Sequence, residues 1–155
     1  MKIKKNIKGL WFYGFSGSGK SYLSKILHNR IKNKKTFIID GDAVRKYISN
    51  DLDYNIRDRK IQILRILGIS NICLQNHVFP VISTVYMNQP VFNLASKLKI
   101  KVIRLVRFNI GKKSKIYLLK NNVVGKDLRL PTLNTKILIN DGSKFFWKKL
   151  IKYIH

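Results

Sequence analysis

Short apolar runs alternate with segments of helical periodicity along the whole chain. Each apolar run is five to nine residues long and rich in β-branched or aromatic residues, which is typical of a buried strand. Five runs have this character: 9–15, 35–40, 78–86, 101–107 and 136–140. Pro80, inside the third run, is awkward for a central strand because proline cannot donate to a sheet ladder.

The intervening segments carry apolar residues at helical spacing. They predict helices over 19–29, 42–48, 55–74 (beginning at Asn55 or Asp58), 89–98 and 143–155. The predicted inward faces are Tyr22, Leu23, Ile26 and Leu27 in the first helix, Ile63, Ile66, Leu67, Ser70 and Leu74 in the third, and Phe146, Leu150, Ile151 and Ile154 in the last. Asp42 can cap the second helix, and Pro90 suits the first turn of the fourth.

Strands that alternate with helices indicate an α/β fold, with helices around a mainly parallel sheet of five strands. No repeat, linker or low-complexity block interrupts this order, so residues 1–155 are predicted to form one domain. Ligands of such folds bind beyond the carboxyl ends of the strands. The residues that follow the first two strands should therefore face a common crevice.

Length and composition indicate the size of the domain and the cellular compartment of the protein. With 155 residues and 45% hydrophobic content, the chain can bury a core without disulfides. A single cysteine, Cys73, excludes an internal disulfide and suits a reducing cytosol. No segment approaches the roughly 20 apolar residues of a membrane span, and no signal peptide is apparent, so a cytoplasmic protein is expected.

The formal net charge of +25 attracts polyanions, but the basic residues spread through every segment instead of forming a patch. A general bias in the composition of the whole chain therefore explains more of the excess positive charge than an anionic substrate does. A nucleic-acid partner is not expected. His28, His77 and His155 share no metal-ligand spacing with Cys73, which argues against a zinc site.

Residues 14–21, GFSGSGKS, match the phosphate-loop pattern G-x-x-x-x-G-K-[ST] between a predicted strand and a predicted helix. Backbone N–H groups of such a loop surround phosphate, Lys20 neutralises it, and the Ser21 hydroxyl ligates Mg²⁺. The expected ATP-binding residues are Gly14, Phe15, Ser16, Gly17, Ser18, Gly19, Lys20 and Ser21. The short chain and the lack of an N-K-x-D stretch favour a small kinase over a GTPase or a motor.

Asp40 and Asp42 flank a single glycine at the end of the second predicted strand. Carboxylates there can orient Mg²⁺ or its waters, and one of them can accept the proton of an attacking hydroxyl. Arg45 follows on the same face of the next helix and suits an anionic substrate, although a surface salt bridge is the alternative.

Four stretches together resemble the adenylylsulfate kinase family: GLWFYGFSGSGKS, IDGDAVRKYISNDLDY, DRKIQILR and NNVVGKDLRLPTLNTKILIND. The resemblance runs in order over most of the chain and is weakest between residues 84 and 119. It implies a nucleotide-kinase-like P-loop fold with three layers. It also implies transfer of the ATP γ-phosphate to the 3′-hydroxyl of adenosine 5′-phosphosulfate (APS), with ATP and Mg²⁺ as cofactors.

Carried over by position, the resemblance implies that Asp42 is the proton acceptor or metal-orienting acid and that Asp40 supports it. Arg45 and Arg59 would grip the phosphosulfate, and Tyr54 would stack on the substrate adenine. Gln62 stands where the family has a substrate-binding asparagine. The implied catalytic residues are Asp42, Lys20 and Asp40, and the implied metal ligands are Ser21 and Asp40.

The chain departs from the family on the substrate side. Ile61 removes a carboxylate, Tyr86 replaces a serine, and Gln89 replaces an arginine. The lid is shortened to about residues 107–122, where only Tyr117 and nearby lysines (Lys112, Lys113 and Lys115) resemble it. A different hydroxyl acceptor on the same scaffold, or a basic nucleic-acid-binding protein with a relict phosphate loop, are the alternatives. A homodimer is left open.

Overall fold

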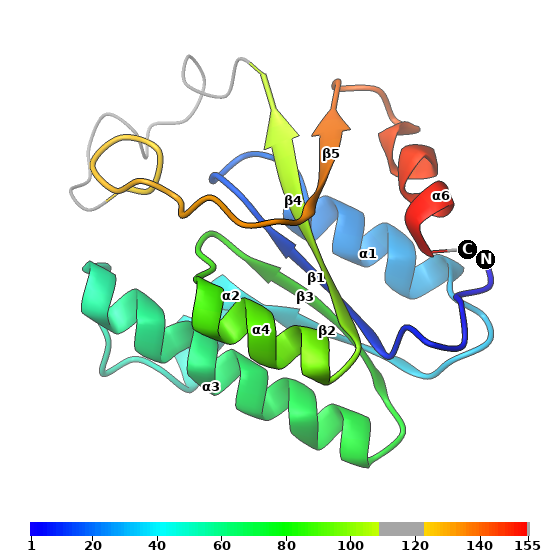
Figure 1. Cartoon of the computed structure of the whole chain (residues 1–155), viewed down its shortest axis with the longest axis horizontal. Coiled ribbons are helices and arrows are strands. Elements are labelled where there is room, and N and C mark those ends of the chain that lie inside the picture. Colours follow the sequence, from blue (N-terminus) through cyan, green and yellow to red (C-terminus); the bar gives the residue numbers. More distant parts are fainter. Residues whose placement is uncertain (109–122, 155) are drawn as a thin grey trace.

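The computed structural model describes residues 1–108 and 123–154. Its centre is a five-stranded sheet in the order β2-β3-β1-β4-β5, and every neighbouring pair is parallel (Figure 1). The strands are β1 (Gly9–Tyr13), β2 (Thr36–Asp40), β3 (Phe79–Thr84), β4 (Ile100–Arg107) and β5 (Lys136–Asn140). The predicted α/β fold with five parallel strands is confirmed.

The described helices are α1 (Lys20–Arg30), α2 (Gly41–Tyr47), α3 (Ile56–Gln75), α4 (Gln89–Lys97), the 3₁₀ helix η1 (Phe146–Leu150) and α6 (Ile151–Ile154). The single closing helix predicted over 143–155 is therefore wrong in form, because its first turn has the tighter 3₁₀ geometry. None of these helices is long and apolar enough to cross a membrane.

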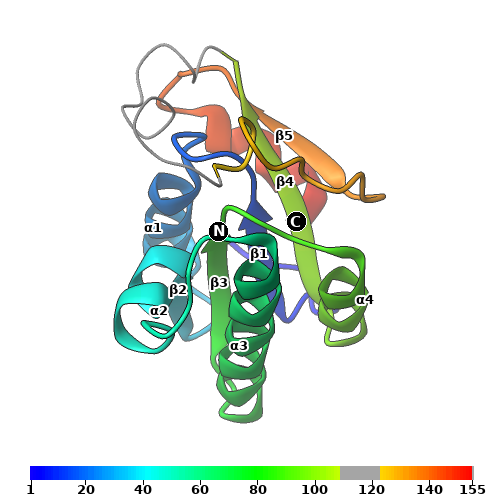
Figure 2. The same ribbon diagram turned by 90° about the vertical axis from the view of Figure 1, so that its left-hand side faces the viewer.

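Two layers of helices cover the sheet (Figure 2). Leu10 and Phe12 of β1 face one core, which α1, η1 and α6 close. Trp11 and Tyr13 face the other core, which includes α3 and α4. Because β1 is buried on both faces, it is a continuous apolar run without alternation, as expected for the centre of a parallel sheet. This arrangement holds the loop after β1 at the middle of the sheet edge.

Three details of the predicted elements are corrected. Tyr22 is 49% exposed, stacked on Phe146 at the surface of α1 instead of pointing inward. Asp40, and not Asp42, caps α2, because its carboxylate accepts from the Asp42 N–H. Pro80 is compatible with an interior strand, because it precedes Val81, where the pairing of β3 with β1 begins.

The predicted lid lies almost wholly outside the described residues. Only Arg107 and Phe108 belong to the described part, whereas Lys112, Lys113, Lys115 and Tyr117 do not. The shortened lid and the single-domain organisation stay predictions.

Candidate active site

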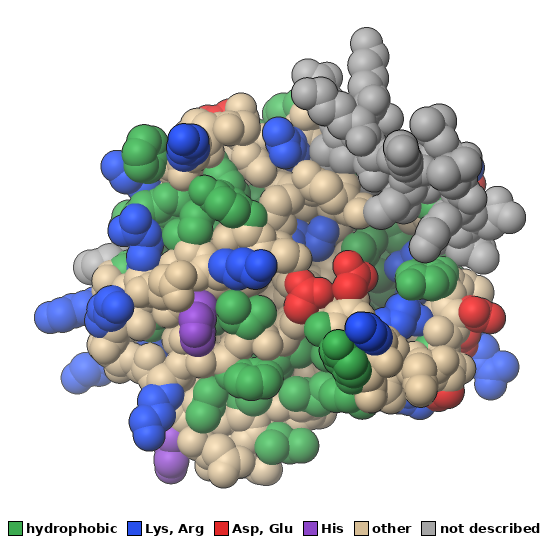
Figure 3. Space-filling view, turned by 180° about the vertical axis from the view of Figure 1, so that it is seen from behind, with side chains coloured by type: hydrophobic (Ala, Val, Ile, Leu, Met, Phe, Trp, Pro, Cys, Tyr) green, Lys and Arg blue, Asp and Glu red, His purple; other side chains and the backbone are tan. Residues whose placement is uncertain are grey.

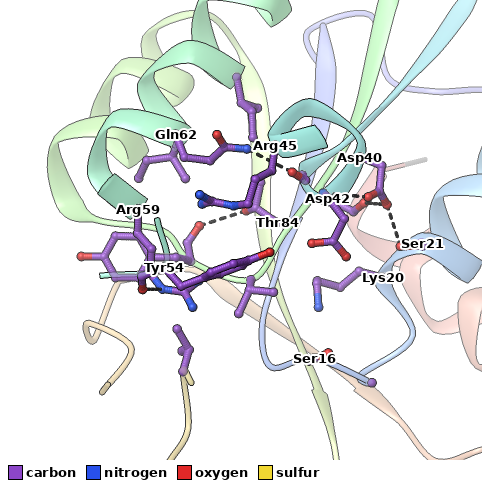
Figure 4. Close-up of a pocket in the computed structure, with 18 of the residues that line it drawn as sticks. Ser16, Lys20, Ser21, Asp40, Asp42, Arg45, Tyr54, Arg59, Gln62 and Thr84 are labelled. Carbon is purple, nitrogen blue, oxygen red and sulfur yellow. Dashed lines mark hydrogen bonds between the residues drawn. The ribbon is translucent and has the colours of Figure 1, made fainter. Parts of the chain in front are cut away.

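The carboxyl ends of β1, β2 and β3 meet at one cavity of about 460 Å³. The glycine-rich loop after β1 forms one end of it, and α2 and α3 form the other. Figure 4 shows Lys20, Ser21, Asp40 and Asp42 on one side, facing Arg45, Tyr54, Arg59 and Gln62 on the other. The structure therefore brings five of the eight predicted phosphate-binding residues to the same cavity as the predicted acceptor residues: Ser16, Gly17, Gly19, Lys20 and Ser21. Gly14, Phe15 and Ser18 belong to the same loop but are not among the residues that line the cavity.

The acidic residues of this site stand out on a basic surface. In the space-filling view of Figure 3, Lys and Arg side chains are scattered, whereas acidic side chains gather near the centre of the face. Asp40 and Asp42 are the acidic residues that line the cavity. The dispersed positive charge is what the sequence predicted, and no basic stripe is visible on this face.

Gly19 allows the phosphate loop to turn into α1. Its φ of 98° lies in the left-handed region, where residues with a Cβ are strained. A Cβ at this position would also lie 2.6 Å from Asn140 Nδ2. Asn140 Nδ2 donates a 2.8 Å hydrogen bond to Ser18 O, so the last strand of the sheet stabilises the conformation of the phosphate loop.

Lys20 reaches back over the loop that precedes it. Its Nζ donates to Phe15 O at 2.8 Å and to Ser18 Oγ at 3.4 Å. Burial lowers the pKa of Lys20 to about 8, although the charges of Asp42 and Asp40 partly oppose that shift. The amine is thus held in the loop, and an incoming phosphate would stabilise its charged form.

Asp40 is the most heavily hydrogen-bonded carboxylate of the site. Ser21 Oγ and Ser83 Oγ donate to its Oδ2 at 2.7 and 2.8 Å, and the Asp42 N–H donates to its Oδ1 at 3.0 Å. Burial acts to raise the pKa of Asp40, but these hydrogen bonds and one from the Ala43 N–H outweigh it, so the pKa falls below the ordinary value. Asp40 is therefore ionised at neutral pH.

Asp42 lies in the first turn of α2 with an exposed carboxylate on the cavity wall. Gly41 makes this position accessible, because a Cβ there would lie 3.0 Å from Ser83 O at the end of β3. The glycine lets the start of α2 pass close to the sheet, so both flanking carboxylates reach the cavity. This close approach explains why the two aspartates flank a glycine.

Ser21 and Asp40 are the residues that could hold a divalent cation. A hydroxyl and an ionised carboxylate 2.7 Å apart, beside a phosphate loop, are oxygen ligands of the kind that Mg²⁺ uses together with nucleotide phosphates. Among the described residues, no three His, Cys, Asp or Glu side chains gather into a metal cluster. Mg²⁺ in phosphotransfer sites is usually bound by one or two protein oxygens together with substrate phosphates, and Ser21 with Asp40 fits that pattern.

Arg45 and Arg59 enclose Tyr54. The Arg45 guanidinium lies 4.6 Å from the centroid of the Tyr54 ring and donates to Leu52 O and Asp53 O. The Arg59 guanidinium lies 5.6 Å from that centroid, and its Nε donates to Tyr54 O at 2.8 Å. The surface salt bridge considered for Arg45 is replaced by these backbone and ring contacts.

Arg59 is only 8% exposed, and burial together with the charge of Arg45 lowers its pKa from the ordinary value. Because the two positive charges repel each other in the cavity wall, an anion bound beside them would be stabilised. Tyr86, which borders the same wall, is buried, and this burial raises the pKa of its hydroxyl.

Sequence reasoning missed several contributors. Ser83, which donates to Asp40, and Thr84, which accepts from Trp11 Nε1 at 2.8 Å, lie at the end of β3. Asn140 lies at the end of β5. The sequence did contain a signal for these residues, because each is a polar residue at the carboxyl end of an otherwise apolar strand. Conversely, Gln89 and Ile61 do not line the cavity, and Gln89 Nε2 instead donates to Asn93.

A strand, a glycine-rich phosphate loop and a helix, with a carboxylate at the end of β2, which β3 separates from β1, define the P-loop kinase class. The chain belongs to the adenylylsulphate kinase family, whose sequence model matches residues 7–104.

Curated relatives match about half of the chain. The adenylyl-sulfate kinase of Buchnera aphidicola is 34% identical over 84 residues, which cover 52% of this chain and 40% of the relative. That of Bacteroides thetaiotaomicron is 30% identical over 91 residues, which cover 57% of this chain and 45% of the relative. The matched stretch thus spans less than half the length of these relatives.

Solved structures share the fold. The APS kinase of Mycobacterium tuberculosis, solved in complex with AMPPNP and APS, has a TM-score of 0.82 at 18% identity, covering 94% of this chain and 96% of that one. The shikimate kinase of Aquifex aeolicus has a TM-score of 0.52 at 14% identity, covering 94% of each chain. At these identities the likeness shows the fold alone.

Proposed function

We propose that this protein is an ATP-dependent kinase that transfers the γ-phosphate to the 3′-hydroxyl of adenosine 5′-phosphosulfate, releasing ADP. The observation that carries the proposal is the shared cavity. Lys20, Ser21 and Asp40 lie at the phosphate end, Arg45 and Arg59 lie at the other end, and Asp42 belongs to the same lining.

In this proposal the acceptor oxygen forms a bond to the γ-phosphorus while the bond to the β,γ-bridging oxygen breaks. The hydroxyl proton passes to Asp42, whose exposed carboxylate lines the cavity next to the phosphate loop. Lys20 offsets charge on the transferring phosphoryl group, and the two arginines hold the anionic end of the acceptor.

Mg²⁺ fits the oxygen ligands of Ser21 and Asp40, which would hold it or its waters beside the phosphates. When bound, the cation neutralises charge on the β- and γ-phosphates. The ionised state of Asp40, maintained by its hydrogen bonds, preserves this capacity at neutral pH.

An ADP-release assay with and without adenosine 5′-phosphosulfate tests the proposal. Acceptor-stimulated release supports it, whereas ATP hydrolysis that APS does not stimulate contradicts the proposed acceptor. The homodimer, the cytoplasmic location and the expectation of no nucleic-acid partner stay predictions.

A further inference from the structure

Gln62 occupies a position for which the family resemblance implies a contact with substrate, yet its amide is engaged elsewhere. The side chain is only 5% exposed, and its Nε2 donates a 3.0 Å hydrogen bond to Gly41 O. Its Oε1 is covered and has no hydrogen-bond partner among the residues that the structure describes. Because the Gly41 carbonyl accepts, the amide must present its nitrogen there, which fixes its orientation.

We infer that Gln62 is a positioning residue for Asp42 and not a contact for the acceptor. This inference rests on the proposed function, since it assigns a task within the same site. Figure 4 shows the Gln62 amide directed at the turn between Asp40 and Asp42.

The peptide unit between Gly41 and Asp42 is held at both of its polar ends. Its carbonyl oxygen accepts from Gln62 Nε2, and its N–H donates to Asp40 Oδ1 at 3.0 Å. The plane of this peptide sets the direction in which the Asp42 side chain leaves the backbone. Gly41 itself is confined by Ser83 O, which a Cβ would approach to 3.0 Å. Asp42 is therefore oriented from β2, β3 and α3 together.

The length of the side chain matters for this role. An asparagine at the same position is one methylene shorter and would not reach Gly41 O without a shift of α3. The covered Oε1 costs free energy because it has lost water without gaining a partner. The hydrogen bond from Gln62 Nε2 to Gly41 O compensates for this cost through its function in orienting Asp42.

One consequence concerns recognition of the acceptor. Gln62 lines that end of the cavity, but its Nε2 is engaged by Gly41 O, so the groups there that suit an anion or an aromatic ring are the guanidinium groups of Arg45 and Arg59 and the Tyr54 ring. The acceptor is then held by charge and stacking, without an N–H donated by the Gln62 amide.

Three variants test the inference: Gln62→Met keeps the volume without a hydrogen bond, Gln62→Glu keeps the shape, and Gln62→Asn restores the family's residue. We expect Gln62→Met and Gln62→Asn to lower kcat for APS about tenfold or more, with KM for APS within about twofold of wild type. Gln89→Met is the matched control, because Gln89 lies outside the cavity, and it should leave both constants unchanged.

Gln62→Glu adds a pH signature that a purely structural role would not show. A buried carboxyl beside a carbonyl oxygen has a raised pKa, and only its protonated form can donate to Gly41 O. The ratio of its kcat to the wild-type kcat should therefore rise as the pH falls from about 8 to about 6. A ratio that is flat with pH, or a Gln62→Asn variant whose KM falls with kcat unchanged, overturns the inference.

Amide hydrogen exchange supplies a readout that does not depend on turnover. The Asp42 and Ala43 amides both donate to Asp40 at the start of α2, and their exchange should accelerate in Gln62→Met but not in Gln89→Met. Unchanged exchange contradicts the inference whatever the activity. If no APS is phosphorylated but exchange accelerates, the proposed function fails while the positioning role stands.

Discussion

Asn140, the last residue of β5, donates a hydrogen bond of 2.8 Å from its side chain to Ser18 O in the phosphate loop. Its Oδ1 accepts from the Gly142 N–H at 2.9 Å, so both ends of the amide are used. Both Asn140 and Ser18 are buried. The strand at one edge of the sheet thereby stabilises the loop at its centre.

Asn140→Ala should loosen the phosphate loop. Removing the side chain leaves Ser18 O buried without its partner, which costs about 1–3 kcal/mol of the free energy of unfolding. Calorimetry with an ATP analogue should show weaker binding, and denaturant titration should show the lower stability. Asn134→Ala, at an exposed position before β5, is the control. Equal nucleotide affinity in both variants would show that the hydrogen bond from Asn140 to Ser18 O does not contribute to nucleotide binding.

Lys20→Met should stabilise the free protein at neutral pH. The folded-state pKa of about 8 lies below the ordinary value of 10.5, so the unfolded chain binds the proton more readily. Stability therefore rises with pH between about 8 and 10.5, and the buried charge penalises the folded state below about 8. The difference between the two pKa values of Lys20 corresponds to roughly 3 kcal/mol of the free energy of unfolding at most. Loss of the hydrogen bond from Lys20 to Phe15 O offsets part of the stabilisation in Lys20→Met.

The measurement is the free energy of unfolding of both proteins from pH 7 to pH 10. The advantage of Lys20→Met should shrink as the pH rises through that range, while Lys25→Met, at an exposed position of the same helix, shows no such trend. An advantage that grows with pH would contradict the assigned direction of the shift.

Asp42→Asn should lose turnover and keep its affinity for ATP. The amide preserves the shape but cannot accept the proton, and a positioned base contributes about a hundredfold or more to the rate. Single-turnover kinetics and nucleotide titration measure the two properties separately. Asp53→Asn, an exposed aspartate in the following turn, serves as the control. Turnover like that of wild type in Asp42→Asn removes this residue from the mechanism.

Arg59→Ala should mainly raise the KM for the acceptor. The buried guanidinium lines the cavity beside Tyr54, and a charge-assisted contact of this kind contributes about 1.5–3 kcal/mol, or roughly ten- to a hundredfold. Arg57→Ala on the same helix is exposed and does not line the cavity, so its KM should match wild type. An unchanged KM in Arg59→Ala would move the acceptor site elsewhere.

The sequence predicted the parts of this molecule that depend on local chemistry. A strand buried on both faces, such as β1, is apolar throughout, and the phosphate loop needs glycines at fixed places, so both are visible in the order of residues. The alternation of strands and helices also predicted that the loop and the Asp40–Asp42 turn would share a crevice.

Contacts between distant segments could not be predicted in the same way. Whether Asp40 or Asp42 capped α2 depended on the exact strand end, since both are good capping residues. The exposed position of Tyr22 depends on η1, because the Phe146 ring of η1 stacks on the Tyr22 ring without burying it. The use of the Gln62 amide depends on how far α3 lies from Gly41, which no local pattern encodes.

The fate of the γ-phosphate tests the proposed function most directly. With γ-labelled ATP, Mg²⁺ and adenosine 5′-phosphosulfate, we expect label on the 3′-oxygen of the acceptor in wild type and little or none in Asp42→Asn. Label that appears only as inorganic phosphate, equally in both proteins and whether or not the acceptor is present, would contradict the claim that this cavity joins a nucleotide site to an acceptor site.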